Sequence, residues 1–207
     1  MRLLKFFILS FFLLAGCTSN HDTDGPPRQP VNIAMIKNAV PRYLPKSRYG
    51  NPRSYVINGK RYYVLNSSKH YNKTGIASWY GSKFHGRLTS TRERYNMLAM
   101  TAASPELPIP CFMRVTNLQN NRSVIVKVND RGPFARNRII DLSYAAALKL
   151  GYSNTGTALV RVSSLDIKQP TNYGYHKPIL YLQVGAFSEH ENALKTKIRA
   201  QQITGEK

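Results

Sequence analysis

The chain has 207 residues, and 30 Lys and Arg against 10 Asp and Glu give it a net charge of +20 at pH 7. No acidic residue occurs from position 25 to position 92, so we expect a long cationic surface that attracts a polyanion. The two cysteines, Cys17 and Cys111, have no His or Cys partners at zinc-finger spacing, so we expect neither a metal site nor a cofactor.

The N-terminus is typical of a secretory signal that ends in a lipobox. A short basic start and a short apolar run lead into Leu14-Ala15-Gly16-Cys17. We expect residues 1–16 to be removed and Cys17 to be acylated as the new N-terminus. Lipoproteins that stay at the inner membrane carry Asp directly after the acylated cysteine, whereas this chain has Thr18. The chain is therefore expected on the periplasmic face of the outer membrane. Export argues against nucleic acid as the polyanion and favours the cell wall or anionic lipid.

Two segments precede the main domain. Residues 17–54 are rich in Pro, Asn and Arg without apolar periodicity, which predicts a flexible basic tether. Residues 55–65 predict a β-hairpin, because strand-forming residues flank Asn58-Gly59, a pair suited to a type I′ turn. Residues 55–74 are therefore expected to be a hairpin and a linker beside the main domain.

Residues 75–166 are predicted to be mainly β, with one or two short helices. Short strands joined by long loops indicate a closed barrel rather than an open sheet. Ser143 can cap a helix over 144–150, and Gly151 can end it. The residues between 97 and 103 are apolar and ambiguous. The predicted strands cover 76–80, 111–118, 123–128, 138–142 and 158–165.

A linker over 167–178 and a strand–helix segment over 179–207 are expected to complete the chain. One strand followed by one helix cannot bury a core by itself.

Asp130 is the first candidate site residue. It ends an apolar strand and precedes Arg131 and the rigid turn of Gly132-Pro133, an arrangement that fixes a side chain in place. The domain has few competing acids, namely Glu93, Glu106, Asp141 and Asp166. Glu106 and Asp166 are expected on the surface. Glu93 fits either a solvated ion pair or a cleft acid, and Asp141 either binds helix amides or faces the cleft.

Seven motifs follow one another along the chain, namely Gly75–Gly81, Phe84–Thr89, Met100–Ala103, Leu107–Pro110, Arg114–Leu118, Val128–Phe134 and Arg138–Ser143. In this order they resemble the rare lipoprotein A (RlpA) family of endolytic peptidoglycan transglycosylases. That resemblance implies a six-stranded double-psi β-barrel. It also implies that residues 179–207 are an incomplete α+β SPOR-like segment, SPOR domains being binders of glycan strands without stem peptides.

The resemblance also implies site residues. The family's catalytic glutamate and aspartate fall on Glu93 and Asp130, and Asp141 falls on a cleft carboxylate of expansin relatives. Ser104 stands where the family usually has His, and Thr91-Arg92 replaces the family's Asn-Gly before the glutamate. A lytic transglycosylase cleaves the MurNAc–GlcNAc bond without water, and one acid/base serves both proton transfers.

We hypothesise that Asp130 is the acid/base and that Glu93 orients the substrate; the reverse assignment stays open. Six further side chains are predicted to bind the substrate. Arg87 and Arg131 would hold lactyl carboxylates, Trp79 and Tyr80 would stack on sugars, and Phe134 would lower the local polarity. His85 is the domain's one imidazole. Trp79 equally fits the core, and Arg131 equally fits a pair with Asp130.

The expected partners are peptidoglycan glycan strands, the membrane through Cys17, and divisome or septal wall proteins. The rival function is a non-catalytic, expansin-like wall binder, which the Ser104 replacement favours. A purely structural lipoprotein that ties membrane to wall is the third interpretation.

Overall fold

The structure, a computed structural model, describes residues 24–167 and 185–204. The predicted signal, Cys17 and most of the 167–178 linker lie outside these residues. The described residues belong to two units, one before and one after residue 168, and each is treated by itself.

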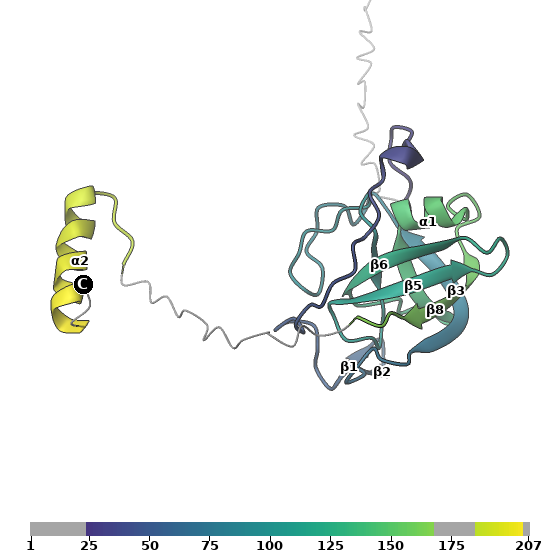
Figure 1. The fold of residues 1–207 in the computed structure, drawn as a ribbon, viewed down its shortest axis with the longest axis horizontal. Coiled ribbons are helices and arrows are strands. Elements are labelled where there is room, and N and C mark those ends of the chain that lie inside the picture. The colour runs from purple at the N-terminus through teal and green to yellow at the C-terminus, as the bar shows by residue number, and fades with distance from the viewer. Residues whose placement is uncertain (1–23, 168–184, 205–207) are drawn as a thin grey trace, which may run out of the picture. The chain divides into compact units, whose positions relative to one another are not determined.

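Six strands of the first unit close into a barrel (Figure 1). The β3–β7 and β4–β6 pairs are parallel, and the other neighbours are antiparallel. This confirms the predicted mainly β barrel and shows that the ambiguous segment supplies the short strand β4. Around the barrel the order is β3 (Asn72–Tyr80), β7 (Arg138–Ser143), β4 (Thr101–Ala103), β6 (Ser123–Asp130), β5 (Cys111–Asn117) and β8 (Ala158–Ser164).

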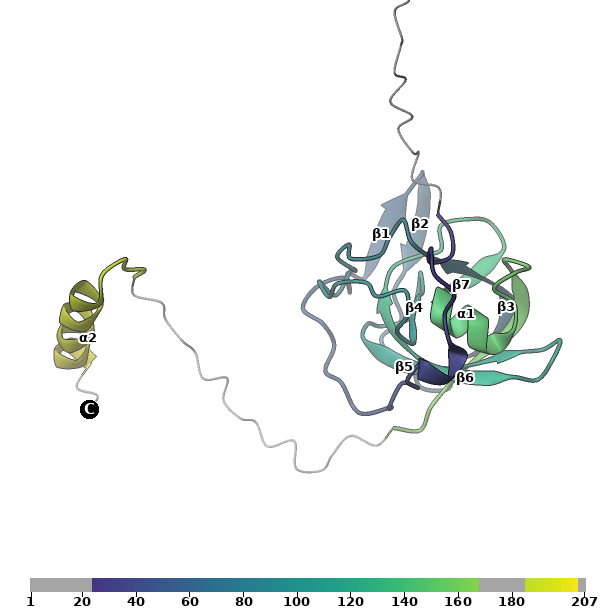
Figure 2. The ribbon, with the colours of Figure 1, turned by 90° about the horizontal axis from the view of Figure 1, so that it is seen from above.

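Side chains alternate along each strand, so every second residue enters the barrel core. Val126, Val128 and Leu142 are fully buried there. Helix α1 (Tyr144–Leu150) packs against β3, β6 and β7 over one end of the barrel (Figures 1 and 2). The Ser143 Oγ accepts a hydrogen bond from the Ala146 amide at 3.2 Å. Gly151 ends the helix at φ 79°, which confirms both predicted caps.

The predicted hairpin is also confirmed. Strands β1 (Ser54–Ile57) and β2 (Lys60–Tyr63) flank Asn58 and Gly59, whose φ angles of 48° and 75° suit a type I′ turn. The Tyr55 hydroxyl donates a 2.7 Å hydrogen bond to the Pro105 carbonyl, which fastens the hairpin to the barrel.

Residues 24–53, here called the strap, depart from the predicted flexible tether. They contain the short 3-10 helix η1 (Ile33–Met35) and run along the barrel (Figure 2). Ile36 is buried in the main core, and the Asn51 side chain hydrogen-bonds both the amide (2.9 Å) and the carbonyl (2.6 Å) of Ile109. Long-range contacts of this kind do not need apolar periodicity, so the composition did not reveal them.

The second unit contains helix α2 (His190–Thr204), which confirms the helix of the predicted strand–helix segment. The strand predicted before it falls mostly outside the described residues. Across the two described stretches, no helix is long and apolar enough to cross a membrane.

Candidate active site

A β-bulge puts Asp130 on the outer face of the barrel. Ala102 pairs with Val128 and Ala103 pairs with Asp130, so Asn129 is an extra residue in β6. In a regular strand Asp130 would follow Val128 into the core. The bulge aligns it instead with Ala103, which belongs to a separate apolar cluster outside the main core. Because of the bulge, the Asp130 carboxylate faces the surface of the barrel instead of its interior.

Asp141 lies on the other side of the same alanine. Ala103 pairs with Asp130 on one neighbouring strand and with Asp141 on the other. The Cα atoms of the two aspartates are thus about two strand spacings apart, roughly 9.5 Å. The two aspartates therefore flank Ala103, which is buried in a cluster with Tyr80, Tyr95 and Met97.

Three donors hold the Asp130 carboxylate. Its Oδ1 accepts hydrogen bonds from the Ser90 amide (2.8 Å), the Ser90 hydroxyl (2.6 Å) and the Arg131 amide (2.8 Å). All three reach the same oxygen, so the carboxylate has one orientation and its Oδ2 remains available to a ligand.

The Glu93 carboxylate is held near the same end of β6 as Asp130. The Thr89 amide donates a 2.8 Å hydrogen bond to the Glu93 carbonyl, which closes the loop that carries Glu93. The Glu93 carboxylate accepts hydrogen bonds from Lys127 (2.5 Å) and Asn129 (2.8 Å). Burial alone would raise the pKa of Glu93, but the Lys127 and Asn129 hydrogen bonds outweigh it and hold the pKa below its ordinary value. Glu93 is therefore a fixed, ionised acceptor.

Asp141 has the opposite electrostatic setting. Burial raises its pKa to about 6, against the opposing effect of Arg138, whose Nη2 lies 3.3 Å from Oδ2. The charge of Asp24 raises the pKa further. Burial raises the pKa of the Tyr80 hydroxyl, and the charges of Asp130 and Asp141 raise it further. Tyr80 therefore interacts electrostatically with both aspartates. A neutral Tyr80 and an Asp141 that takes up a proton as the pH falls through about 6 thus lie near the fixed Asp130.

Comparisons with known proteins agree with this geometry. The model of a family described as lytic transglycolase matches residues 72–162, from the first barrel strand into the last. A protein of Rickettsia felis named endolytic peptidoglycan transglycosylase RlpA is 39% identical over 168 residues, which cover 79% of this chain and 72% of that protein.

The chain belongs to the RlpA family. Proteins of the same name from Vibrio cholerae and Pseudomonas aeruginosa are 44% identical over 176 residues and 50% identical over 151 residues. The matches cover 83% and 73% of this chain, but 66% and 44% of those relatives' own lengths. Family membership confirms the resemblance seen in the motifs and the double-psi β-barrel.

Ser104, at the position where the RlpA family usually has His, is fully buried. Its hydroxyl accepts a hydrogen bond from the Leu107 amide at 3.2 Å, and its own amide donates to the Asp130 carbonyl at 3.0 Å. Ser104 therefore shapes the turn behind Asp130.

Arg131 links the segments of the chain that surround the site. Its guanidinium donates to the carbonyls of Gly50 (2.7 Å), Ser104 (3.0 Å) and Leu107 (2.6 Å), and to the Asn51 side chain (3.2 Å). Four of its five N–H donors are engaged in this way, and within the described residues the guanidinium forms no ion pair with Asp130. This geometry favours a structural role over the predicted grip on a lactyl carboxylate.

The two predicted stacking residues pack against other aromatic rings of the barrel domain. The Trp79 ring packs edge-on against Tyr144 at 5.2 Å, and its N–H donates to the Ser153 carbonyl at 3.1 Å. The Tyr80 ring stacks on Tyr95 at 4.1 Å. Tyr80 is buried, and Trp79 is half-buried against the main core, which favours the core alternative for Trp79.

The other predicted binding residues are exposed. His85 accepts a hydrogen bond from the Met97 amide through Nδ1 at 3.2 Å, and Arg87 lies over the Phe84 ring at 5.9 Å. Phe134 packs edge-on against Tyr62 at 5.5 Å, on the hairpin. The structure leaves their binding roles as predictions.

Three residues that the sequence did not single out complete the site. Ser90 fixes Asp130, while Lys127 and Asn129 fix Glu93. Only Asn129 had a signal, as the neighbour of Asp130. In the part of the chain that the structure describes, no cluster of His, Cys, Asp and Glu suits a metal ion. Burial raises the pKa of the Cys111 thiol to about 12, which suits an unreactive residue packed against the core.

Proposed function

We propose that this chain is a lytic transglycosylase that cleaves the β-1,4 bond from MurNAc to GlcNAc in peptide-stripped glycan strands and leaves 1,6-anhydro-MurNAc. The observation that carries the proposal is the convergence of Asp130, Asp141 and Glu93 on one edge of the barrel. Few other acids exist in the domain, so this convergence is unlike a random surface distribution. The names of the relatives support the same reaction.

Asp130 is the acid/base in this proposal. Because Oδ1 already accepts three hydrogen bonds, the catalytic proton belongs on Oδ2. Oδ2–H protonates the glycosidic oxygen as the bond to MurNAc C1 breaks through an oxocarbenium-like state. The resulting carboxylate then takes the proton of the MurNAc C6 hydroxyl, whose oxygen attacks C1 and closes the anhydro ring.

Glu93 and Asp141 have supporting roles. The lowered pKa of Glu93 makes it a poor proton donor, which favours Asp130 in the assignment that the sequence left open. An ionised Glu93 can accept hydrogen bonds from sugar hydroxyls and so orient the strand. Asp141, whose pKa is about 6, changes charge near neutral pH and stabilises the oxocarbenium-like state when it is ionised.

Product analysis on peptide-free glycan strands tests the proposal. The wild type should release anhydro-ended fragments, and Asp130→Asn should reduce their formation by about 100-fold or more. Glu93→Gln should slow the reaction less. Equal anhydro product from the wild type and Asp130→Asn would overturn the role of Asp130. A wild type that pulls down glycan strands without any product would establish the wall-binder alternative.

We also propose that the protein is lipid-anchored through Cys17 on the periplasmic face of the outer membrane. The lipobox supports this location. Metabolic labelling with a fatty-acid analogue should mark the wild type, and Cys17→Ser should abolish the label. A labelled Cys17→Ser protein would refute the anchor.

A further inference from the structure

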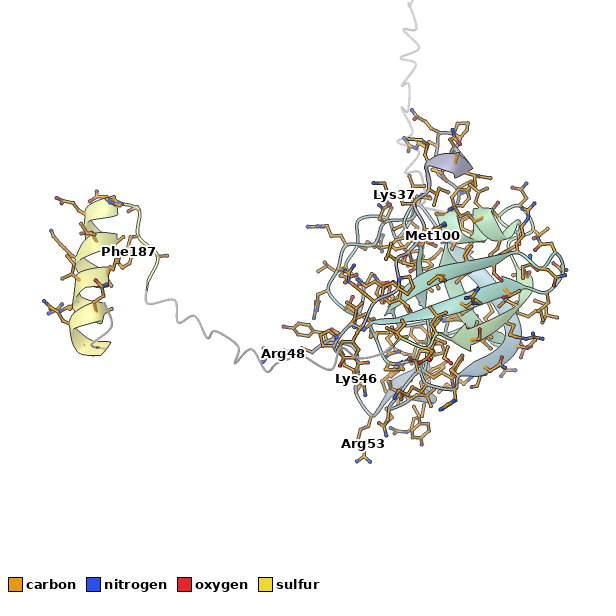
Figure 3. The ribbon with its side chains drawn as sticks, viewed as in Figure 1. Lys37, Lys46, Arg48, Arg53, Met100 and Phe187 are labelled. Atoms are coloured by element: carbon orange, nitrogen blue, oxygen red, sulfur yellow. The ribbon has the colours of Figure 1, made fainter. Side chains whose placement is uncertain are left out.

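A groove runs between the strap and the barrel, next to the candidate active site. Its volume is about 450 Å³, and it is lined by strap residues between 35 and 42, loop residues between 96 and 101, Phe112 and Lys127. Figure 3 shows Lys37 and Met100, which both line this strap groove, on the same side of the barrel. The sequence-based interpretation of the strap as a free tether concealed this groove.

The strap groove is cationic. Lys37, Arg42 and Lys127 line it, and its lining contains no Asp or Glu. Lys37 and Arg42 are exposed, and no hydrogen bond or ion pair joins either side chain to another described residue. Their charges are therefore available to an anionic ligand.

A second hollow of about 210 Å³ continues the same surface. Arg42 and Phe112 line both hollows, and Lys46 and Lys69 add two more cations to the second. No acidic residue lines the second hollow either. The two hollows thus form one cationic path along the strap.

Lys127 connects this cationic path to the candidate active site. Its ammonium group pairs with Glu93, and Lys127 is also one of the residues that line the strap groove. On β6 it precedes Asp130 by three residues, which corresponds to roughly 10 Å along a strand. A polymer whose scissile bond lies at Asp130 can therefore continue into the groove.

We propose that the strap groove binds the uncleaved part of a peptide-free glycan strand through the lactyl carboxylates of its MurNAc residues. This inference rests on the proposed function. Lys37 and Arg42 would pair with these carboxylates, while Met35 and Leu98 would pack against the apolar faces of the sugars. When a stem peptide is attached, the lactyl group is an amide without charge, so the groove selects stripped strands.

Binding measured without cleavage tests the groove directly. In the Asp130→Asn background, Lys37→Gln/Arg42→Gln should weaken affinity for peptide-free strands about tenfold. Arg114→Gln/Arg161→Gln is the matched control, because both arginines are exposed on β5 and β8, line neither hollow, and carry the same total charge. The control should bind as tightly as its parent.

Two comparisons make the result specific. The groove variant should lose its advantage for peptide-free over peptide-bearing strands, whereas vesicles with phosphatidylglycerol should bind both double variants alike. Equal losses for the two double variants, or a selective loss of vesicle binding, would overturn the proposal. A selective loss of glycan binding supports the groove even if the wild type yields no anhydro product, so the two claims fail separately.

Discussion

Replacing Asp141 by Asn should stabilise the fold above pH 6, although it removes a site carboxylate. Burial raises the pKa of Asp141 from an ordinary 3.8 to about 6, despite the neighbouring Arg138. The ionised form is therefore less compatible with the folded state than with the unfolded chain. Asn resembles the protonated acid in shape and cannot ionise, so it avoids this penalty.

The sign and size follow from the proton balance. Between pH 3.8 and about 6 the folded protein keeps the Asp141 proton while the unfolded chain loses it. The stability from this group is thus complete below pH 3.8 and is lost as the pH rises through 6. The two pKa values differ by about two, and each pKa unit corresponds to ~1.36 kcal/mol, so the loss is about 3 kcal/mol.

Urea unfolding at acidic and neutral pH measures this loss. Near pH 4 the wild type and Asp141→Asn should have similar free energies of unfolding, and at pH 7.5 the variant should be more stable by about 2–3 kcal/mol. Asp166→Asn removes the same charge from an exposed position and should show no such gain. An Asp141→Asn protein that is less stable than the wild type at pH 7.5 would refute the reasoning.

Three further predictions concern the supports of the site. Ser90→Ala removes the 2.6 Å bond to Asp130 and should lower kcat about 10-fold or more with little change in KM; an unchanged kcat would contradict this. Arg131→Lys should lower the free energy of unfolding in urea by about 2–4 kcal/mol and expose the strap near Asn51 to proteases, because a Lys ammonium group cannot form the four hydrogen bonds of the planar guanidinium. Cys111 should resist iodoacetamide at pH 8 until the protein is unfolded, since burial raises its thiol pKa to about 12; rapid native labelling would count against that environment.

Local signals predicted much of the barrel. The Ser143 cap, Gly151 and the Asn58-Gly59 turn each act through neighbouring backbone atoms, so a short stretch of sequence defines them. Alternating apolar residues likewise predicted most of the strands. The short strand β4 stayed ambiguous because three residues carry too little periodicity.

The site depends on pairings between distant residues, and these escaped prediction. The bulge at Asn129 is defined by the register with β4, and without it the sequence pattern would direct Asp130 into the core. Arg131 was predicted to bind substrate, yet its partners are carbonyls of the strap and of the 104–107 turn. Ser90 reaches Asp130 across 40 residues of sequence.

The most direct test of the central claim is the source of the oxygen at the new glycan end. Peptide-free strands digested in water enriched in oxygen-18 should yield fragments with unlabelled 1,6-anhydro ends, each lighter by one water molecule than a hydrolysed end. Asp130→Asn should yield almost none of these fragments. Fragments with reducing ends that carry oxygen-18, or unchanged anhydro product from Asp130→Asn, would contradict non-hydrolytic cleavage by Asp130.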